Sequence, residues 1–178
     1  TNRTIISRSA AIRVGYGITP VRHCVFRNIT IRDSNRGIGV FIRNGQNISD
    51  LLFSHITIET RLFTGWWGCG EPIHLSAVPG YTDDTSLGEI RNIRFEHITA
   101  KGPQGILIYG ADQTDGGKHL RDLHFENVSV EIVKDPLHLR FGGNVDLRPA
   151  TEVRYRVFER DLPGMLIQNV EGLCCKTV

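Results

Sequence analysis

One pattern of apolar and polar positions occurs four times in the chain. Each copy alternates apolar and polar residues with period two, and its apolar positions favour Phe, Ile and Val. The copies are 21–31, 48–58, 90–100 and 120–130, aligned on Phe26, Phe53, Phe95 and Phe125 at spacings of 27, 42 and 30 residues. This alternation is typical of strands that bury one face. Its repetition at such intervals indicates a solenoid, a propeller or a similar array.

A second short strand is predicted after each turn. The stretches 11–15, 39–43, 72–76, 105–109 and 136–140 all read small, apolar, variable, apolar, variable. The predicted inward pairs are Ile12/Val14, Val40/Ile42, Ile73/Leu75, Ile106/Ile108 and Leu137/Leu139. No stretch carries an apolar stripe at helical spacing, and a propeller blade would need four strands per repeat. The chain is therefore predicted to be all-β, a right-handed parallel β-helix.

Two details of the repeat predict local structure. The Leu51-Leu52 doublet interrupts the alternation, which indicates a bend or bulge between two short strands. The residues two positions after each Phe are polar and would stack in a ladder of hydrogen-bonding side chains. They are Asn28, His55, His97 and Asn127. We expect this ladder to be structural.

Composition narrows the class of protein. The chain has 178 residues, 40% hydrophobic and 22% charged, with a net charge of +2, which suits one domain over 1–178 with a less regular part at 144–178. It has no Lys-rich run, which argues against a nucleic-acid partner, and no apolar run long enough to span a membrane. Its four cysteines show no spacing of a zinc site or a disulfide framework, so no metal or cofactor is expected.

The two ends lie within the repeat pattern. The sequence starts part-way through a repeat, and residues 165–170 read as one more strand. We therefore expect a fragment of a longer solenoid, incomplete at both ends. Uncapped strand edges predict self-association into a homo-oligomer.

Outward side chains of the second strands predict a binding surface. One column reads Arg13, Phe41, His74, Leu107 and His138, and the next reads Gly15, Arg43, Ser76, Tyr109 and Arg140. Neighbouring strands lie about 4.8 Å apart, so such columns would form a strip of cationic and aromatic groups. A ligand with carboxylates would relieve the repulsion between the arginines, and sugar rings stack on aromatic faces. The predicted substrate-binding residues are Arg13, Arg43, Trp66, Trp67, His74, Tyr109, His138 and Arg140, with an acidic polysaccharide or oligosaccharide as partner. The alternative is solvated arginines and a Trp pair packed on the solenoid.

Catalytic carboxylates are harder to find. Glycoside hydrolysis needs two carboxyl groups on either side of the scissile bond. No such pair occupies adjacent outward positions, and Glu71, just before Pro72, is the single candidate. An ion pair with a neighbouring arginine such as Arg43 is an equally good interpretation of Glu71.

Several segments together resemble glycoside hydrolase family 28, the polygalacturonases, rhamnogalacturonases and bacterial relatives of the pectin lyase-like superfamily. These are 28–34 (NITIRDS), 39–43 (GVFIR), 48–51 (ISDL) and 53–56 (FSHI), with 65–73 (GWWGCGEPI) and 145–149 (VDLRP) resembling the bacterial relatives. The family's Gly-His-Gly motif would fall near Ser9-Ala10-Ala11, where its histidine is absent. Its Arg-Ile-Lys motif would fall at Phe41-Ile42-Arg43, where only the second cation is kept.

The resemblance implies a polysaccharide-processing protein that acts on pectin-like galacturonan or rhamnogalacturonan. The family suggests a secreted or periplasmic protein, but the sequence shows no signal peptide and its cysteines look unpaired, so the localisation is left open. The family's catalytic aspartates would lie before Thr1, so this chain is expected to lack them and its activity is left open. Two alternatives remain. One is a polysaccharide lyase, which in this superfamily uses an arginine base and calcium held by carboxylates. The other is a non-catalytic solenoid that binds glycan or self-assembles.

Overall fold

The computed structural model describes residues 3–80, 86–112, 117–134, 146–147 and 163–178, and every regular element in these ranges is a β-strand. The strands of the first sheet are β1 (Arg3–Ile5), β3 (Val21–Ser34), β5 (Ile48–Thr60), β7 (Ile90–Gly102), β9 (Leu120–Ile132) and β11 (Val170–Lys176). The strands of the second sheet are β2 (Ala10–Gly15), β4 (Arg36–Ile42), β6 (Ile73–Ala77), β8 (Ile106–Gly110) and β10 (Met165–Gln168). Within the described ranges there is no helix that could cross a bilayer.

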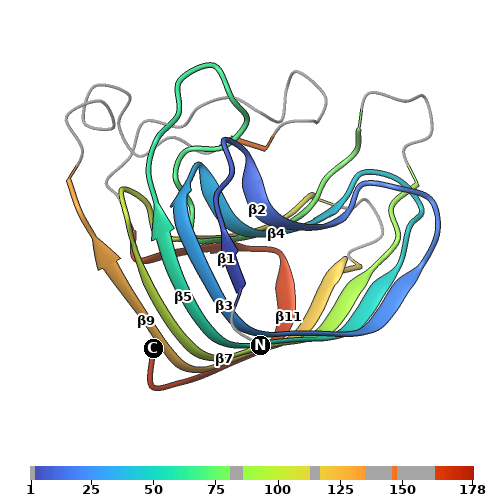
Figure 1. Cartoon of the computed structure of the whole chain (residues 1–178). Helices are drawn as coiled ribbons and strands as arrows, with labels where there is room; N and C mark the ends of the chain where they lie inside the picture. Colours follow the sequence, from blue (N-terminus) through green and yellow to red (C-terminus); the bar gives the residue numbers. More distant parts are fainter. Residues whose placement is uncertain (1–2, 81–85, 113–116, 135–145, 148–162) are drawn as a thin grey trace.

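The chain passes from one sheet to the other and back. The first sheet has the order β1-β3-β5-β7-β9-β11 and the second β10-β8-β6-β4-β2, and every pairing is parallel. Each pass through both sheets therefore lies beside the previous pass, and Figure 1 shows the two sheets facing each other across the interior. The predicted all-β class with parallel, repeating strands is confirmed.

The four predicted repeats align as the sequence indicates. Phe26, Phe53, Phe95 and Phe125 are direct partners across β3, β5, β7 and β9. Their rings stack with centroid distances of 4.8, 5.1 and 4.8 Å and interplanar angles of 8°, 8° and 14°. The last three rings are fully buried between the sheets. Stacked pairs of this kind add about 0.5–1.5 kcal/mol each beyond the area that they bury.

Each long strand bends at two positions where the backbone is left-handed. At the first level stand His23, Asp50, Asn92 and Asp122, with φ between 52° and 57°. At the second level stand Asn28, His55, His97 and Asn127, with φ between 53° and 58°. Asn, Asp and His adopt this region at lower cost than other residues with a Cβ, which explains their recurrence. Figure 1 shows the long strands bent accordingly.

The first level explains the interruption that the sequence shows at Leu51-Leu52, because the left-handed residue Asp50 comes just before it. There Asn92 Nδ2 donates to Asp50 Oδ1 at 2.7 Å, so two neighbouring residues of this level are joined by a side-chain hydrogen bond. At the second level, where the sequence predicted it, the contact is a stack of the His55 and His97 rings at 4.8 Å. The residues of both levels lie at the bends of the long strands, which fits the structural role expected for the polar ladder.

The register of the second sheet differs from the prediction by two residues at β4. Ile38 and Val40, rather than Val40 and Ile42, lie between Ile12/Val14 and Ile73/Leu75. Gly39 therefore stands between Arg13 and His74, the place predicted for Phe41. The Phe41 ring folds back over Gly39, where an added Cβ would lie 2.3 Å from it. A shift of two residues keeps the same side chains inward, so the alternation alone could not set this register.

The fifth strand of the second sheet is β10. Leu166 pairs with Leu107 and Gln168 with Tyr109, so these two residues take the places predicted for His138 and Arg140. Residues 136–140 themselves, with His138 and Arg140, lie outside the described residues. The strand predicted at 165–170 is present as β10 and continues after Asn169 into β11.

Candidate functional site

The outward face of the second sheet is covered rather than open. The loop between β5 and β6 is hydrogen-bonded to Asn35 before β4, and the carbonyl oxygens of Asp146 and Leu147 accept from Arg36 and Arg43. Leu147 is fully buried in an apolar cluster with Val78, Leu107 and Ala111. The strip that the sequence predicted as a binding surface is therefore largely an interface inside the molecule.

Arg36 and Glu71 form a buried ion pair at the centre of this interface. Arg36 Nε donates to Glu71 Oε2 at 3.2 Å and Arg36 Nη2 to Oε1 at 3.4 Å, and both side chains are at most 2% exposed. Arg36 Nη2 also donates to the carbonyl oxygen of Asp146 at 3.1 Å, and the Cys69 N–H donates to Glu71 Oε2 at 2.9 Å. Burial alone would raise the pKa of Glu71, but the Arg36 guanidinium and the Cys69 N–H hold it well below its usual range.

The Glu71 carboxylate is thus ionised and fully engaged. The partner is Arg36 rather than the suggested Arg43, and the ion-pair interpretation of Glu71 describes the structure. A glycosidase acid needs a carboxyl whose pKa is raised, so Glu71 is unsuited to that role.

His74 is completely buried beside this pair. Its ring meets the Phe41 ring edge-on, with centroids 5.0 Å apart, and its Nδ1 lies 3.6 Å from Glu71 Oε1, too long for a hydrogen bond. Among the described residues neither ring nitrogen has a hydrogen-bond partner. Burial, and then the positive charge of Arg36, lower the pKa of His74 to about 4. The ring is therefore neutral near pH 7.

The Arg43 side chain is buried, and its guanidinium is hydrogen-bonded to three separate stretches of the chain. Its guanidinium donates to the carbonyl oxygens of Ile42 at 2.8 Å, Ser76 at 3.1 Å and Leu147 at 3.0 Å, and to Ser76 Oγ at 2.9 Å. The side chain is 3% exposed. These contacts occupy the donors that a ligand carboxylate would need, so Arg43 does not present the surface that the sequence predicted.

The loop that carries the Trp pair, residues 61–70, is here called the Trp loop. Asn35 ties it to the start of β4, because its Nδ2 donates to Trp67 O at 3.0 Å and its Oδ1 accepts from Phe63 N at 3.0 Å. Asp146 Oδ2 accepts from Gly68 N at 2.6 Å. Trp66 and Trp67 nevertheless remain 47% and 41% exposed. Asn35 and Asp146 thus fix the loop backbone by hydrogen bonds, while the two Trp rings remain partly exposed to solvent.

The other predicted binding residues are spread out. Arg13 is exposed on β2, next to Gly39, and Tyr109 is half-buried against the Leu147 cluster. Sequence reasoning missed Asn35, Arg36 and Asp146, which hold the covering segments. The one available signal was indirect, since Asp146 lies in the VDLRP segment that carried part of the family resemblance.

Comparison with protein-family models, curated proteins and solved structures finds no match to this chain. The resemblance to glycoside hydrolase family 28 thus stays a prediction that rests on the quoted residues. Over the described part of the chain, no group of three or more His, Cys, Asp or Glu residues could hold a metal ion.

Proposed function

We propose that this chain forms a right-handed parallel β-helix that binds carbohydrate, of the pectin-like class that its sequence resembles, and that binding uses the Trp loop. Two parallel sheets whose strands alternate along the chain support this architecture. Stacked phenylalanines and matched bends, pass after pass, support it further.

The observation that carries the proposal is the Trp pair. Two neighbouring rings, about half exposed, sit on a backbone that Asn35 and Asp146 hold in place. A loop fixed before binding loses little conformational entropy when a ligand arrives. Large rings with an apolar face and a polar N–H suit the apolar faces and hydroxyl groups of sugars.

The described residues favour binding over hydrolysis. Inverting and retaining glycosidases both need two carboxyl groups around the bond, one of them protonated. Glu71 is ionised and engaged with Arg36, and His74 beside it is closed off from solvent. The buried cluster therefore supports the Trp loop and takes no part in proton transfer.

Calorimetric titration with a galacturonate oligomer, together with Trp fluorescence, tests the proposal. Binding should quench or shift the fluorescence, and replacing both tryptophans (Trp66→Ala with Trp67→Ala) should weaken it at least tenfold. Tyr16→Asn is the matched control, because Tyr16 is 44% exposed in another turn and its positive φ of 65° suits Asn. Equal binding by the control and the double variant, or no binding by the unaltered protein, would reject the proposal.

The same samples distinguish the enzymatic alternatives. New reducing ends would indicate a glycoside hydrolase. An unsaturated product that absorbs in the ultraviolet would indicate a polysaccharide lyase.

A further inference from the structure

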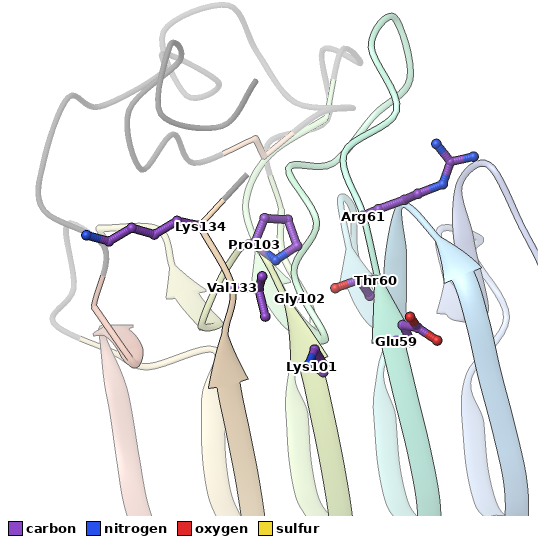
Figure 2. A pocket seen from close by; sticks show the side chains of 8 residues that line it. All are labelled: Glu59, Thr60, Arg61, Lys101, Gly102, Pro103, Val133 and Lys134. Carbon is purple, nitrogen blue, oxygen red and sulfur yellow. The ribbon is translucent and has the colours of Figure 1, made fainter. Parts of the chain in front are cut away.

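A pocket of about 280 Å³ lies where β5, β7 and β9 end, and none of its lining residues is one of the predicted site residues. Figure 2 shows its lining, which comes from these three strand ends and the turns that follow them. Three cations line it, Arg61, Lys101 and Lys134, against one carboxylate, Glu59. Two apolar residues, Pro103 and Val133, complete the wall, and Val133 is 40% exposed.

The floor of the pocket is rigid. Thr60 Oγ1 donates to Gly70 O at 2.7 Å, and Val133 N donates to Gly102 O at 2.8 Å. A Cβ at Gly102 would lie 2.0 Å from Thr60 Oγ1, so the strands approach here as closely as only glycine permits. The shape of the pocket is therefore set by backbone and small side chains, and only its long rim residues need to adjust to a ligand.

The three cations are not equivalent. Arg61 pairs with the Asp33 carboxylate and lies over the Phe63 ring, with its guanidinium carbon 3.8 Å from the ring centroid. Lys101 pairs with Glu131 at 3.1 Å. None of the described residues pairs with Lys134, and Figure 2 shows Lys134 and Arg61 extended away from each other on either side of Pro103. Lys134 is thus the lining cation without an ion-pair partner in the described part of the chain, and its long side chain, which extends away from the other lining residues, must turn toward the pocket to meet a ligand.

We propose that this pocket binds the carboxylate-bearing unit of an acidic saccharide, with Lys134 supplying the charge and Pro103 and Val133 the apolar contact. The inference rests on the proposed function, and the Trp loop links the two. That loop begins at Arg61 on the rim of the pocket and carries Trp66 and Trp67, so the pocket and the Trp pair share one short segment of the chain. The acidic preference of the protein then arises at these strand ends and not on the covered face of the second sheet.

The test compares a galacturonate oligomer with its fully methyl-esterified form, which keeps the sugar rings and loses the charges. The protein is titrated with each while Trp fluorescence reports on the Trp loop. We expect both ligands to perturb the fluorescence and the acidic one to bind about two- to fivefold more tightly at low salt, the range of one solvent-exposed charge pair. That advantage should disappear in Lys134→Gln and fade as salt screens the charges.

Lys118→Gln is the matched control. Lys118 is an exposed lysine in another turn, where its ammonium group donates to Asn169 Oδ1 at 3.1 Å. Loss of the acidic preference in Lys134→Gln, with Lys118→Gln unchanged, supports the pocket. Equal affinity for the two ligands, or an equal effect of the two variants, overturns it while leaving binding by the Trp loop intact. If neither ligand binds, the pocket and the proposed function both fall.

Discussion

Breaking the buried ion pair of Arg36 and Glu71 should destabilise the packing of the Trp loop and of residues 146–147 against the second sheet. In Glu71→Leu the Arg36 guanidinium stays buried, and its contacts with the described residues are reduced to the bond to the Asp146 carbonyl and the Phe41 ring, while the Cys69 N–H loses its bond to Glu71 Oε2. Removing one partner of a buried ion pair typically costs about 3–5 kcal/mol, because the other charge remains without compensation. Arg36→Met should cost a similar amount at neutral pH.

The double variant is the informative one. With Arg36→Met and Glu71→Leu combined, no buried charge is left over, and the remaining cost is that of unpaired backbone groups, about 1–3 kcal/mol each. The free energy of unfolding should therefore fall by much less than the sum of the two single losses. Urea unfolding, followed by circular dichroism and by fluorescence of Trp66 and Trp67, measures all four proteins. Fluorescence should respond first if the Trp loop is released before the strands unfold.

A second pair provides the control. Lys101 and Glu131 also come from different strands and lie 3.1 Å apart, but their side chains are 55% and 65% exposed. Exposed pairs contribute about 0–1 kcal/mol, so the same cycle with Lys101→Met and Glu131→Leu should show little coupling. The reasoning is refuted if Glu71→Leu costs less than about 1 kcal/mol, or if the losses at Arg36 and Glu71 add to within about 0.5 kcal/mol.

Three further outcomes are expected. Because the folded-state pKa of His74 is about 4 against 6.5 when unfolded, the unfolded chain takes up the proton first, and stability should fall by up to about 3 kcal/mol as the pH drops from 6.5 to 4. In His74→Leu the loss of stability between about pH 6.5 and 4.5 should disappear. Urea midpoints measured across this pH range test this, and the same pH dependence in His74→Leu and the unaltered protein would contradict it. At the left-handed position of Asn92, with φ 52°, Asn92→Val should cost about 1–2 kcal/mol and Asn92→Gly less, by thermal unfolding. Phe95→Ala should remove about 3–5 kcal/mol from the stacked core, while Val25→Ala, 63% exposed, stays within about 0.5 kcal/mol.

The first sheet could be predicted from the sequence because its repeat contains a marker that fixes register. Phenylalanine occurs once in each copy at the same place, and a strand shifted by any number of residues would break the stack of Phe53 and Phe95. The second sheet has no such marker. Its strands carry three or more interchangeable aliphatic residues, so β4 could shift by two residues without exposing an apolar side chain.

The covered site could not be predicted for a different reason. Arg36 and Asp146 are 110 residues apart, and Arg43 and Leu147 are 104 apart. Contacts between such distant positions leave no periodic signal in a single sequence. From the sequence, an arginine at an outward strand position is expected to be exposed. Arg36 and Arg43 are buried because the Trp loop and residues 146–147 pack over them. The sequence singled out the Trp pair because the aromatic doublet stands in a glycine-rich loop that the repeat does not need. The structure exposes both rings, and their binding role stays a prediction.

Arg36 and Arg43 both reach the segment at Asp146 and Leu147 through main-chain carbonyl oxygens. Every amino acid provides a main-chain carbonyl oxygen, so substitutions at 146 and 147 would not remove these hydrogen-bond acceptors. In these contacts side-chain identity matters at the two arginines, while the Asp146 carboxylate and the buried Leu147 side chain are constrained separately by Gly68 and by the apolar cluster. The same two arginine contacts would therefore survive any substitution that leaves the backbone at 146 and 147 in place.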